Sequence, residues 1–127
     1  NLIIYLSESL QEAHGGHLGF WASENGSPSE LVTEIAPRFN RAVLFDTTQN
    51  SWHGMSRNLI QPEGIYRKSL AIYYLCDPPF KVDPRSRALY APREHQKNDP
   101  VILEVIQKRA DLARSEQVYQ TLDHAKK

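Results

Sequence analysis

Three residues in the middle of the chain have side chains that could hold a metal ion and a carboxylate: His53, Arg67 and Ser69. They lie in the segments WHGM and YRKSLAIYYL, whose residue types are typical of β-strands. Because side chains alternate between the two faces of a strand, Arg67 and Ser69 share one face. An arginine on a face that buries apolar residues needs an anion, and its fork suits a carboxylate, with the Ser69 hydroxyl as a further donor. The pattern predicts a site for a small diacid.

These residues also have ordinary structural interpretations. A single histidine after a strand is usually a surface or hydrogen-bonded residue, and Arg67 could instead pair with Glu63 at the edge of a sheet. The inward Arg-x-Ser pattern favours the carboxylate role.

Composition limits the class of protein. The chain has 127 residues, 40% hydrophobic and 24% charged, which suits one globular domain and includes no apolar run long enough to span a bilayer. Lys+Arg and Asp+Glu number 15 each, so the formal net charge is zero and nothing favours nucleic acid as a partner. Cys76 is the single cysteine, which excludes an intrachain disulfide and favours a reducing, cytoplasmic location.

Short segments of strand composition, separated by turn residues, occupy the first part of the chain and predict an antiparallel sandwich or barrel. They are residues 1–6, 17–21, 31–36, 41–46, 52–56 and 65–75. Six aromatic residues are interpreted as packing residues: Phe20, Trp21, Phe39, Phe45, Tyr73 and Tyr74.

The chain changes character after residue 76. Residues 80–98 are polar and rich in proline, and Asp99 followed by Pro100 predicts the start of a helix that runs to about residue 120. We therefore expect a β-rich core over 1–76 and a C-terminal extension over 77–127 with a helix at about 99–120.

Five motifs follow one another in a fixed order, and together they carry a family resemblance. They are NLIIYL, a Gly-Gly pair followed by HLGFW, then PRFNRAVLFD, WHGM and YRKSLAIYYL. The ordered set resembles the iron(II)- and 2-oxoglutarate-dependent dioxygenases, specifically the prolyl-hydroxylase-like branch, over residues 1–75. This resemblance implies a double-stranded β-helix, the jelly-roll or cupin-like fold.

The resemblance also implies residue roles. His53 would be the distal histidine of a two-histidine, one-carboxylate iron(II) site. Arg67, helped by Ser69 and Tyr5, would bind the distal carboxylate of 2-oxoglutarate, and Leu18 would form an apolar wall of that pocket. The implied reaction is oxidative decarboxylation of 2-oxoglutarate to succinate, coupled to hydroxylation of a C–H bond in a peptide or small metabolite. Ascorbate is an additional candidate cofactor.

One departure from the family pattern matters. The His-x-Asp or His-x-Glu that would supply the other two iron ligands does not occur in these 127 residues. We expect it to lie before Asn1, so that the fold lacks its first strands and the chain is an inactive fragment of an active enzyme. His14 and His17, which flank the Gly-Gly pair, are expected to be surface residues rather than replacement ligands.

Missing strands would leave unpaired edges, which predicts a homodimer or larger homo-oligomer. The alternative function is a non-enzymatic cupin-like module that binds a carboxylate or serves in oligomerisation without iron.

Overall fold

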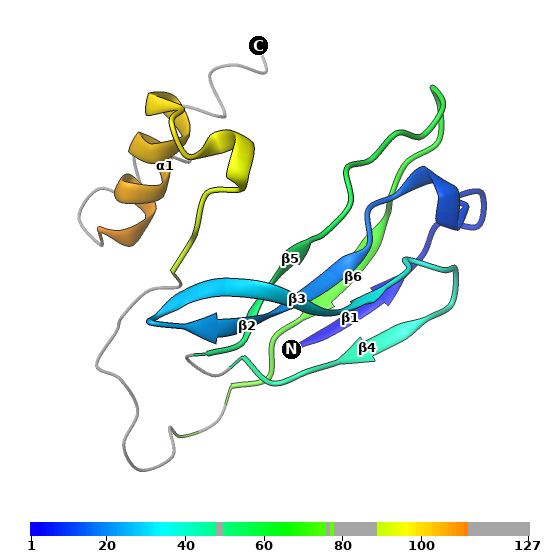
Figure 1. Cartoon of the computed structure of the whole chain (residues 1–127). Coiled ribbons are helices and arrows are strands. Elements are labelled where there is room, and N and C mark those ends of the chain that lie inside the picture. Colours follow the sequence, from blue (N-terminus) through cyan, green and yellow to red (C-terminus); the bar gives the residue numbers. More distant parts are fainter. Residues whose placement is uncertain (48–49, 76, 78–88, 112–127) are drawn as a thin grey trace. The chain divides into compact units, whose positions relative to one another are not determined.

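The computed structural model describes residues 1–47, 50–75, 77 and 89–111 of the chain (Figure 1). The chain divides into two compact units, Asn1–Val82 and Asp83–Lys127, which are described separately. In the first unit the described elements are β1 (Leu2–Tyr5), a 3₁₀ turn (Glu12–His14), β2 (Leu18–Glu24), β3 (Ser27–Ile35), β4 (Ala42–Leu44), β5 (Trp52–Met55) and β6 (Ser69–Ile72).

The strands form two small antiparallel sheets, with the orders β4-β1-β6 and β3-β2-β5 (Figure 1). Each central strand therefore pairs with at least one strand that is distant in the sequence: β1 with β4 and β6, and β2 with β5. Non-local antiparallel pairing of this kind is typical of sandwiches and barrels. The prediction of a β-rich core followed by a C-terminal helix is confirmed.

The inner faces of the two sheets pack against each other. The buried core consists of Tyr5 and Val43 from the first sheet and Leu18 from the second. Partly buried residues complete the cluster: Ile3, Phe20, Ile35 and Phe45. Alternation along β1 places Ile3 and Tyr5 on this inner face, and alternation along β2 places Leu18 and Phe20 there. The core is small, so a side chain on the inner face of either sheet lies next to this cluster.

The outer face of the β4-β1-β6 sheet is also apolar. Two rows of paired residues cross it: Leu44, Leu2 and Ile72, and Ala42, Ile4 and Leu70. Leu44 is 72% exposed and Leu70 is 49% exposed. Strands that are apolar on both faces are typical of sheets covered on both sides.

The loop between β2 and β3 forms a tight hairpin. Asn25 and Gly26 have φ angles of 51° and 75°. Both residues at the tip of a two-residue hairpin turn take this conformation, which asparagine and glycine adopt most readily.

The predicted sixth strand, residues 65–75, is much shorter in the structure. β6 begins at Ser69, so Arg67 precedes it. The physical reason lies in Ser7, whose Oγ donates to the carbonyl of Tyr66 at 2.7 Å and accepts from the amide of Lys68 at 2.6 Å. The Ser7 side chain thus takes the place of the backbone hydrogen-bond partner that the Lys68 amide would have in a longer strand.

The expected packing role of three aromatic residues is wrong. Phe39, Tyr73 and Tyr74 are exposed. Phe39 lies in the turn before Asn40, whose φ is 59°, and the two tyrosines follow the end of β6, beyond the paired rows of the sheet. Phe20 and Phe45 do pack, with ring centroids 5.1 Å apart in an edge-to-face arrangement.

The second unit contains a short 3₁₀ turn, Glu94–Gln96, and helix α1, Pro100–Ala110. Asp99 caps α1 as predicted, because its side chain accepts hydrogen bonds from the amides of Val101 at 2.9 Å and Ile102 at 3.3 Å. Asp111 has extended backbone angles, and residues 112–120 of the predicted helix lie outside the described residues. Within the described ranges, none of the helices has the length and apolar character needed to cross a membrane.

Candidate functional site

Arg67 lies on the inner side of the first sheet, next to Tyr5. It is half-buried, and its Nε donates to the carbonyl of Gly16 at 2.9 Å. Its Cζ lies 5.1 Å from the centre of the Tyr5 ring, which is within the range of cation–π contacts. The guanidinium therefore lies between the Gly16 carbonyl and the Tyr5 ring, where an anion could approach its Nη atoms.

Tyr5 is 0% exposed, and its hydroxyl has no hydrogen-bond partner among the described residues. Burial raises the pKa of the phenol above its ordinary value of 10.0, and the positive charges of Arg67 and Arg41 offset only part of this effect. The phenol is therefore neutral and able to donate. A buried donor without a partner, next to a guanidinium, suits a carboxylate ligand.

The other two predicted cosubstrate residues lie close to this pair in the fold. Ser69 is the first residue of β6 and lies directly opposite Tyr5 in the sheet register, where it is exposed. Leu18 is 4% exposed and belongs to the core cluster with Tyr5 and Val43. Their predicted roles, as a further donor and as an apolar wall, stay predictions.

His53 lies on β5, opposite Phe20 on β2. Its ring is exposed on one side and packs against Phe45, with centroids 4.8 Å apart, and more distantly against Phe20, at 6.4 Å. Nδ1 lies 2.7 Å from the carbonyl oxygen of Ser51. A carbonyl can only accept, so Nδ1 carries the hydrogen and Nε2 keeps its lone pair. This tautomer suits a metal ligand that is oriented by the backbone.

His53 and Arg67 reach the same core cluster from the two facing sheets. Phe20 and Phe45, which contact His53, pack on the cluster that contains Tyr5, which contacts Arg67. Neither side chain lies on an outer face.

A complete iron site is not assembled in the described residues. A two-histidine, one-carboxylate site needs three ligands in one place. The residues that the structure describes contain no group of three His, Cys, Asp or Glu side chains that could hold a metal ion. This part of the chain fits one ligand, His53, and does not fit the whole iron centre.

The expectation that His14 and His17 are surface residues is wrong for His17. His17 is 2% exposed, and neither ring nitrogen has a hydrogen-bond partner within the described ranges. The Nε2 atom lies 4.0 Å from Oε1 of Glu12. Long-range pairing explains the burial, since the amide of Ser56 donates to the His17 carbonyl at 2.9 Å and draws the chain after β5 against this position.

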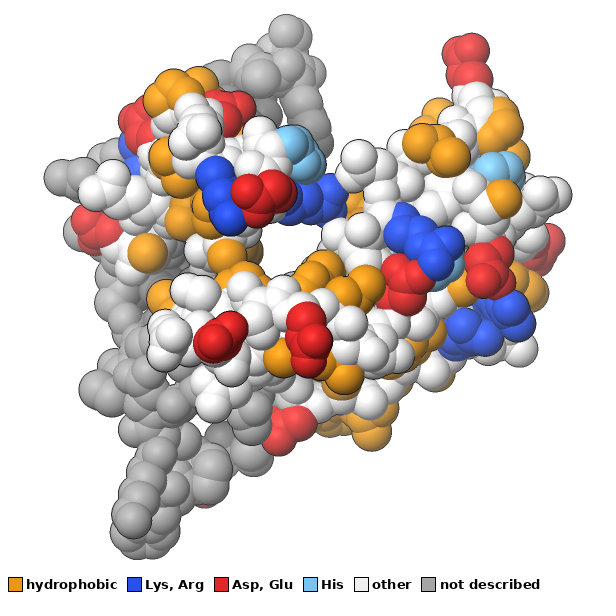
Figure 2. All heavy atoms as spheres, in the orientation of Figure 1, with side chains coloured by type: hydrophobic (Ala, Val, Ile, Leu, Met, Phe, Trp, Pro, Cys, Tyr) orange, Lys and Arg blue, Asp and Glu red, His pale blue; other side chains and the backbone are white. Residues whose placement is uncertain are grey.

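Two ion pairs lie around His17. Arg38 pairs with Glu12 at 2.6 Å, and Arg57 pairs with Glu34. Acidic and basic side chains also lie next to each other at several places on the face of the molecule shown in Figure 2. Both pairs join residues more than twenty positions apart, so the sequence offered no signal for them.

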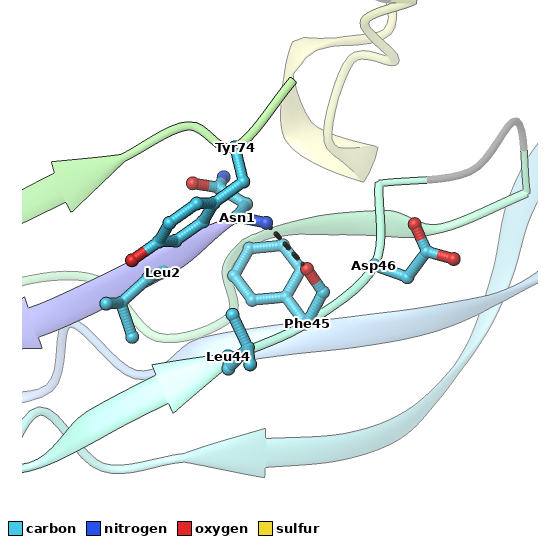
Figure 3. Close-up of a pocket in the computed structure, with 6 residues that line it drawn as sticks. All are labelled: Asn1, Leu2, Leu44, Phe45, Asp46 and Tyr74. Atoms are coloured by element: carbon cyan, nitrogen blue, oxygen red, sulfur yellow. Dashed lines mark hydrogen bonds between the residues drawn. The ribbon is translucent and has the colours of Figure 1, made fainter. Parts of the chain in front are cut away.

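A shallow, open pocket lies at the start of β1 (Figure 3). It is lined by Asn1, Leu2, Leu44, Phe45, Asp46 and Tyr74. The amino group of Asn1 donates to the Phe45 carbonyl at 2.9 Å, which ties the chain start to β4. The pocket includes none of the predicted site residues and touches the site only through Phe45.

Comparison with known proteins identifies the family. The family model described as the 2OG-Fe(II) oxygenase superfamily matches residues 1–75, which include both sheets. A curated relative, a prolyl 3-hydroxylase of Xenopus laevis, is 30% identical over 100 residues, which cover 74% of this chain and 19% of the relative. No solved structure matches. The resemblance stated from the sequence is confirmed: this chain belongs to the 2OG-Fe(II) oxygenase superfamily.

Proposed function

We propose that this chain provides the 2-oxoglutarate-binding side of an oxygenase that hydroxylates a C–H bond. The observation that carries the proposal is the pairing of a half-buried guanidinium, Arg67, with the fully buried and unpartnered hydroxyl of Tyr5. A carboxylate ligand would accept hydrogen bonds from both groups and compensate the charge of the guanidinium. Family membership supplies the general chemistry, which uses iron(II) and 2-oxoglutarate.

The residues of the site would act by binding and orienting the cosubstrate. The two Nη atoms of Arg67 would donate to the distal carboxylate in parallel, and the Tyr5 hydroxyl and Ser69 would add further donors. Leu18 would exclude water from the methylene groups. His53 would be one ligand of the iron, which supplies the oxygen chemistry when bound. The described residues do not by themselves complete an iron centre.

The finer assignments belong to this proposal. Two facing antiparallel sheets support an incomplete double-stranded β-helix. The printed name of the Xenopus laevis relative specifies prolyl 3-hydroxylation, and we propose a prolyl residue in a peptide as the first substrate to test. A homo-oligomeric state, a cytoplasmic location and the use of ascorbate follow from the sequence predictions and complete the proposal.

Cosubstrate binding by the 127-residue chain tests the central claim. Isothermal titration with 2-oxoglutarate is expected to show binding that falls by about tenfold to a hundredfold in Arg67→Gln, since charge-assisted hydrogen bonds are lost. Arg38→Gln is the matched control, because Arg38 is exposed and paired with Glu12. Equal binding by Arg67→Gln and the wild type would contradict the proposal.

A non-enzymatic carboxylate-binding module is the second candidate, because the arrangement of Arg67 and Tyr5 suits a carboxylate whether or not a metal is bound. Succinate production from 2-oxoglutarate in the presence of iron(II) distinguishes the two. The oxygenase predicts turnover by a longer protein that also carries the missing His-x-Asp or His-x-Glu, and His53→Ala in that protein should abolish it. The module predicts binding without turnover in the same protein. Turnover that survives in His53→Ala would refute the role of His53 as a ligand.

A further inference from the structure

The backbone of the Gly15–Gly16 turn lies directly against the Arg67 side chain. Gly16 has a φ of +70°, and its carbonyl accepts the hydrogen bond from Arg67 Nε. A Cβ atom at position 16 would lie 2.8 Å from Cδ of Arg67 and 2.7 Å from Cδ2 of Leu59. Contacts this short do not persist in folded proteins, so any other residue at position 16 would displace the arginine, the leucine or both.

This contact determines which hydrogens of the guanidinium remain for a ligand. Arginine has five N–H donors in a rigid fork, and the Gly16 carbonyl takes the one on Nε. The Tyr5 ring supports the guanidinium from another direction. A long side chain normally samples many rotamers, so two fixed contacts reduce the entropy lost when a ligand binds. These two contacts hold the outer end of the fork in position.

We propose that Gly16 is a positioning residue that fixes the depth of the Arg67 fork and thereby sets the length of diacid that the site accepts. The inference rests on the proposed function, because it concerns the same cosubstrate. A fork held at one depth fits a diacid of one length where the far end of the diacid is held as well, and the iron that His53 would help to bind would hold that end. The site should therefore favour 2-oxoglutarate over oxaloacetate, which is one carbon shorter, and 2-oxoadipate, which is one carbon longer.

Substitution of glycines with similar backbone angles isolates this contact. Gly16→Ala is compared with Gly26→Ala and Gly64→Ala, because all three glycines have positive φ angles, of +70°, +75° and +82°. A Cβ at position 26 or 64 would meet no atom within 4 Å. The backbone strain is thus alike, and only Gly16→Ala adds a clash with Arg67.

Titration of each variant with 2-oxoglutarate, oxaloacetate and 2-oxoadipate is the experiment. Gly16→Ala should weaken 2-oxoglutarate binding by about tenfold or more and reduce the preference over the other two diacids. The two controls should stay within about threefold of the wild type and keep the preference. A purely structural role for Gly16 would leave the length preference unchanged.

Arg67→Lys provides a second measurement that leaves the turn intact. Lysine keeps the charge but lacks the Nε donor and the fork, so this variant should lose the length preference even if Gly16→Ala does not fold.

The outcomes separate the two claims. If the wild-type chain fails to bind 2-oxoglutarate, the proposed function is overturned and this inference falls with it. If the wild type binds but Gly16→Ala matches Gly64→Ala in affinity and preference, only the positioning role is overturned. A length preference that survives in Arg67→Lys would also overturn it.

Discussion

Two carboxylates beside the buried His17 are each held by an arginine. The hydrogen bond from Arg38 lowers the pKa of Glu12, and hydrogen bonds from Arg57 and Ser56 lower the pKa of Glu34. Ser56 Oγ donates to Glu34 Oε2 at 2.9 Å, so this carboxylate joins two positions that follow β5 to β3. The ion pairs therefore link segments that the strand ladder alone does not connect.

The lowered pKa of Glu34 gives a pH-dependent stability with a defined sign. Because the folded-state pKa lies below the ordinary value of 4.5, the ionised form favours folding. The stabilisation is present above about pH 4.5 and is lost as the pH falls through the folded-state pKa. Urea unfolding at pH 7 and pH 3 should therefore show a smaller loss of stability in Glu34→Gln than in the wild type.

The matched control for this experiment is Glu24→Gln, since Glu24 is exposed at the end of β2. It should follow the wild-type pH profile. A Glu34→Gln variant that loses as much stability as the wild type between the two pH values would contradict the assignment.

Sequence reasoning located the candidate site residues by alternation along single strands. It placed Arg67 and Tyr5 on inward faces, and both do lie there. It could not foresee that the Arg67 Nε would be taken by a backbone carbonyl 51 positions away, or that Tyr5 and Ser69 would be directly paired. His17 was misjudged for the same reason, because its burial depends on pairing with distant segments that no local pattern encodes.

At the level of elements, the hydrogen bonds of the Ser7 side chain continue the pairing of β1 with β6 beyond the ends of both strands. Ser7 continues the inward alternation of Ile3 and Tyr5, which is a signal that the sequence did contain. Its buried hydroxyl replaces a backbone partner for the segment that carries Arg67. The position of Arg67 therefore depends on a hydroxyl as well as on the strand ladder.

Ser7→Ala is expected to destabilise the fold by about 1 to 3 kcal/mol, because it removes the two hydrogen bonds that the buried Ser7 hydroxyl makes with the Lys68 amide and the Tyr66 carbonyl. The free energy of unfolding from urea titration measures this. Ser9→Ala, two residues further along and exposed, should change stability by less than about 0.5 kcal/mol. Equal effects of the two substitutions would show that the Ser7 hydrogen bonds contribute nothing specific.

Elements with a strong local signal were predicted well, and elements defined by pairing were not. The Asn25–Gly26 hairpin and the start of α1 at Asp99 and Pro100 have their own turn and cap chemistry. The end of β6 has no such signal, because a strand ends where its neighbour ends, and β1 offers only four paired residues. Residue composition alone therefore overestimated its length.

For the molecule as a whole, the apolar outer face of the β4-β1-β6 sheet is the feature that bears on assembly. Contiguous exposed apolar side chains on a sheet commonly mark a contact surface. The formal net charge is zero, so little electrostatic repulsion opposes association. Both properties agree with the homo-oligomer expected from the sequence.

Light scattering of the purified chain over a range of concentrations tests this expectation. The wild type should associate as its concentration rises, and Leu44→Lys should shift it toward the monomer by placing a charge on the outer face. Val32→Lys serves as the control, since Val32 is similarly exposed at 65% but lies on the other sheet. A wild-type chain that stays monomeric throughout would contradict the prediction.

The edge-to-face contact between Phe45 and His53 has a spectroscopic consequence. Protons that lie near an aromatic ring experience the field of its circulating electrons, so the carbon-bound protons of His53 should resonate away from those of a solvated histidine. Since the rings lie only 4.8 Å apart, even a modest rotation of the imidazole would shift that resonance. Proton NMR can therefore follow coordination at Nε2 directly, without waiting for a product.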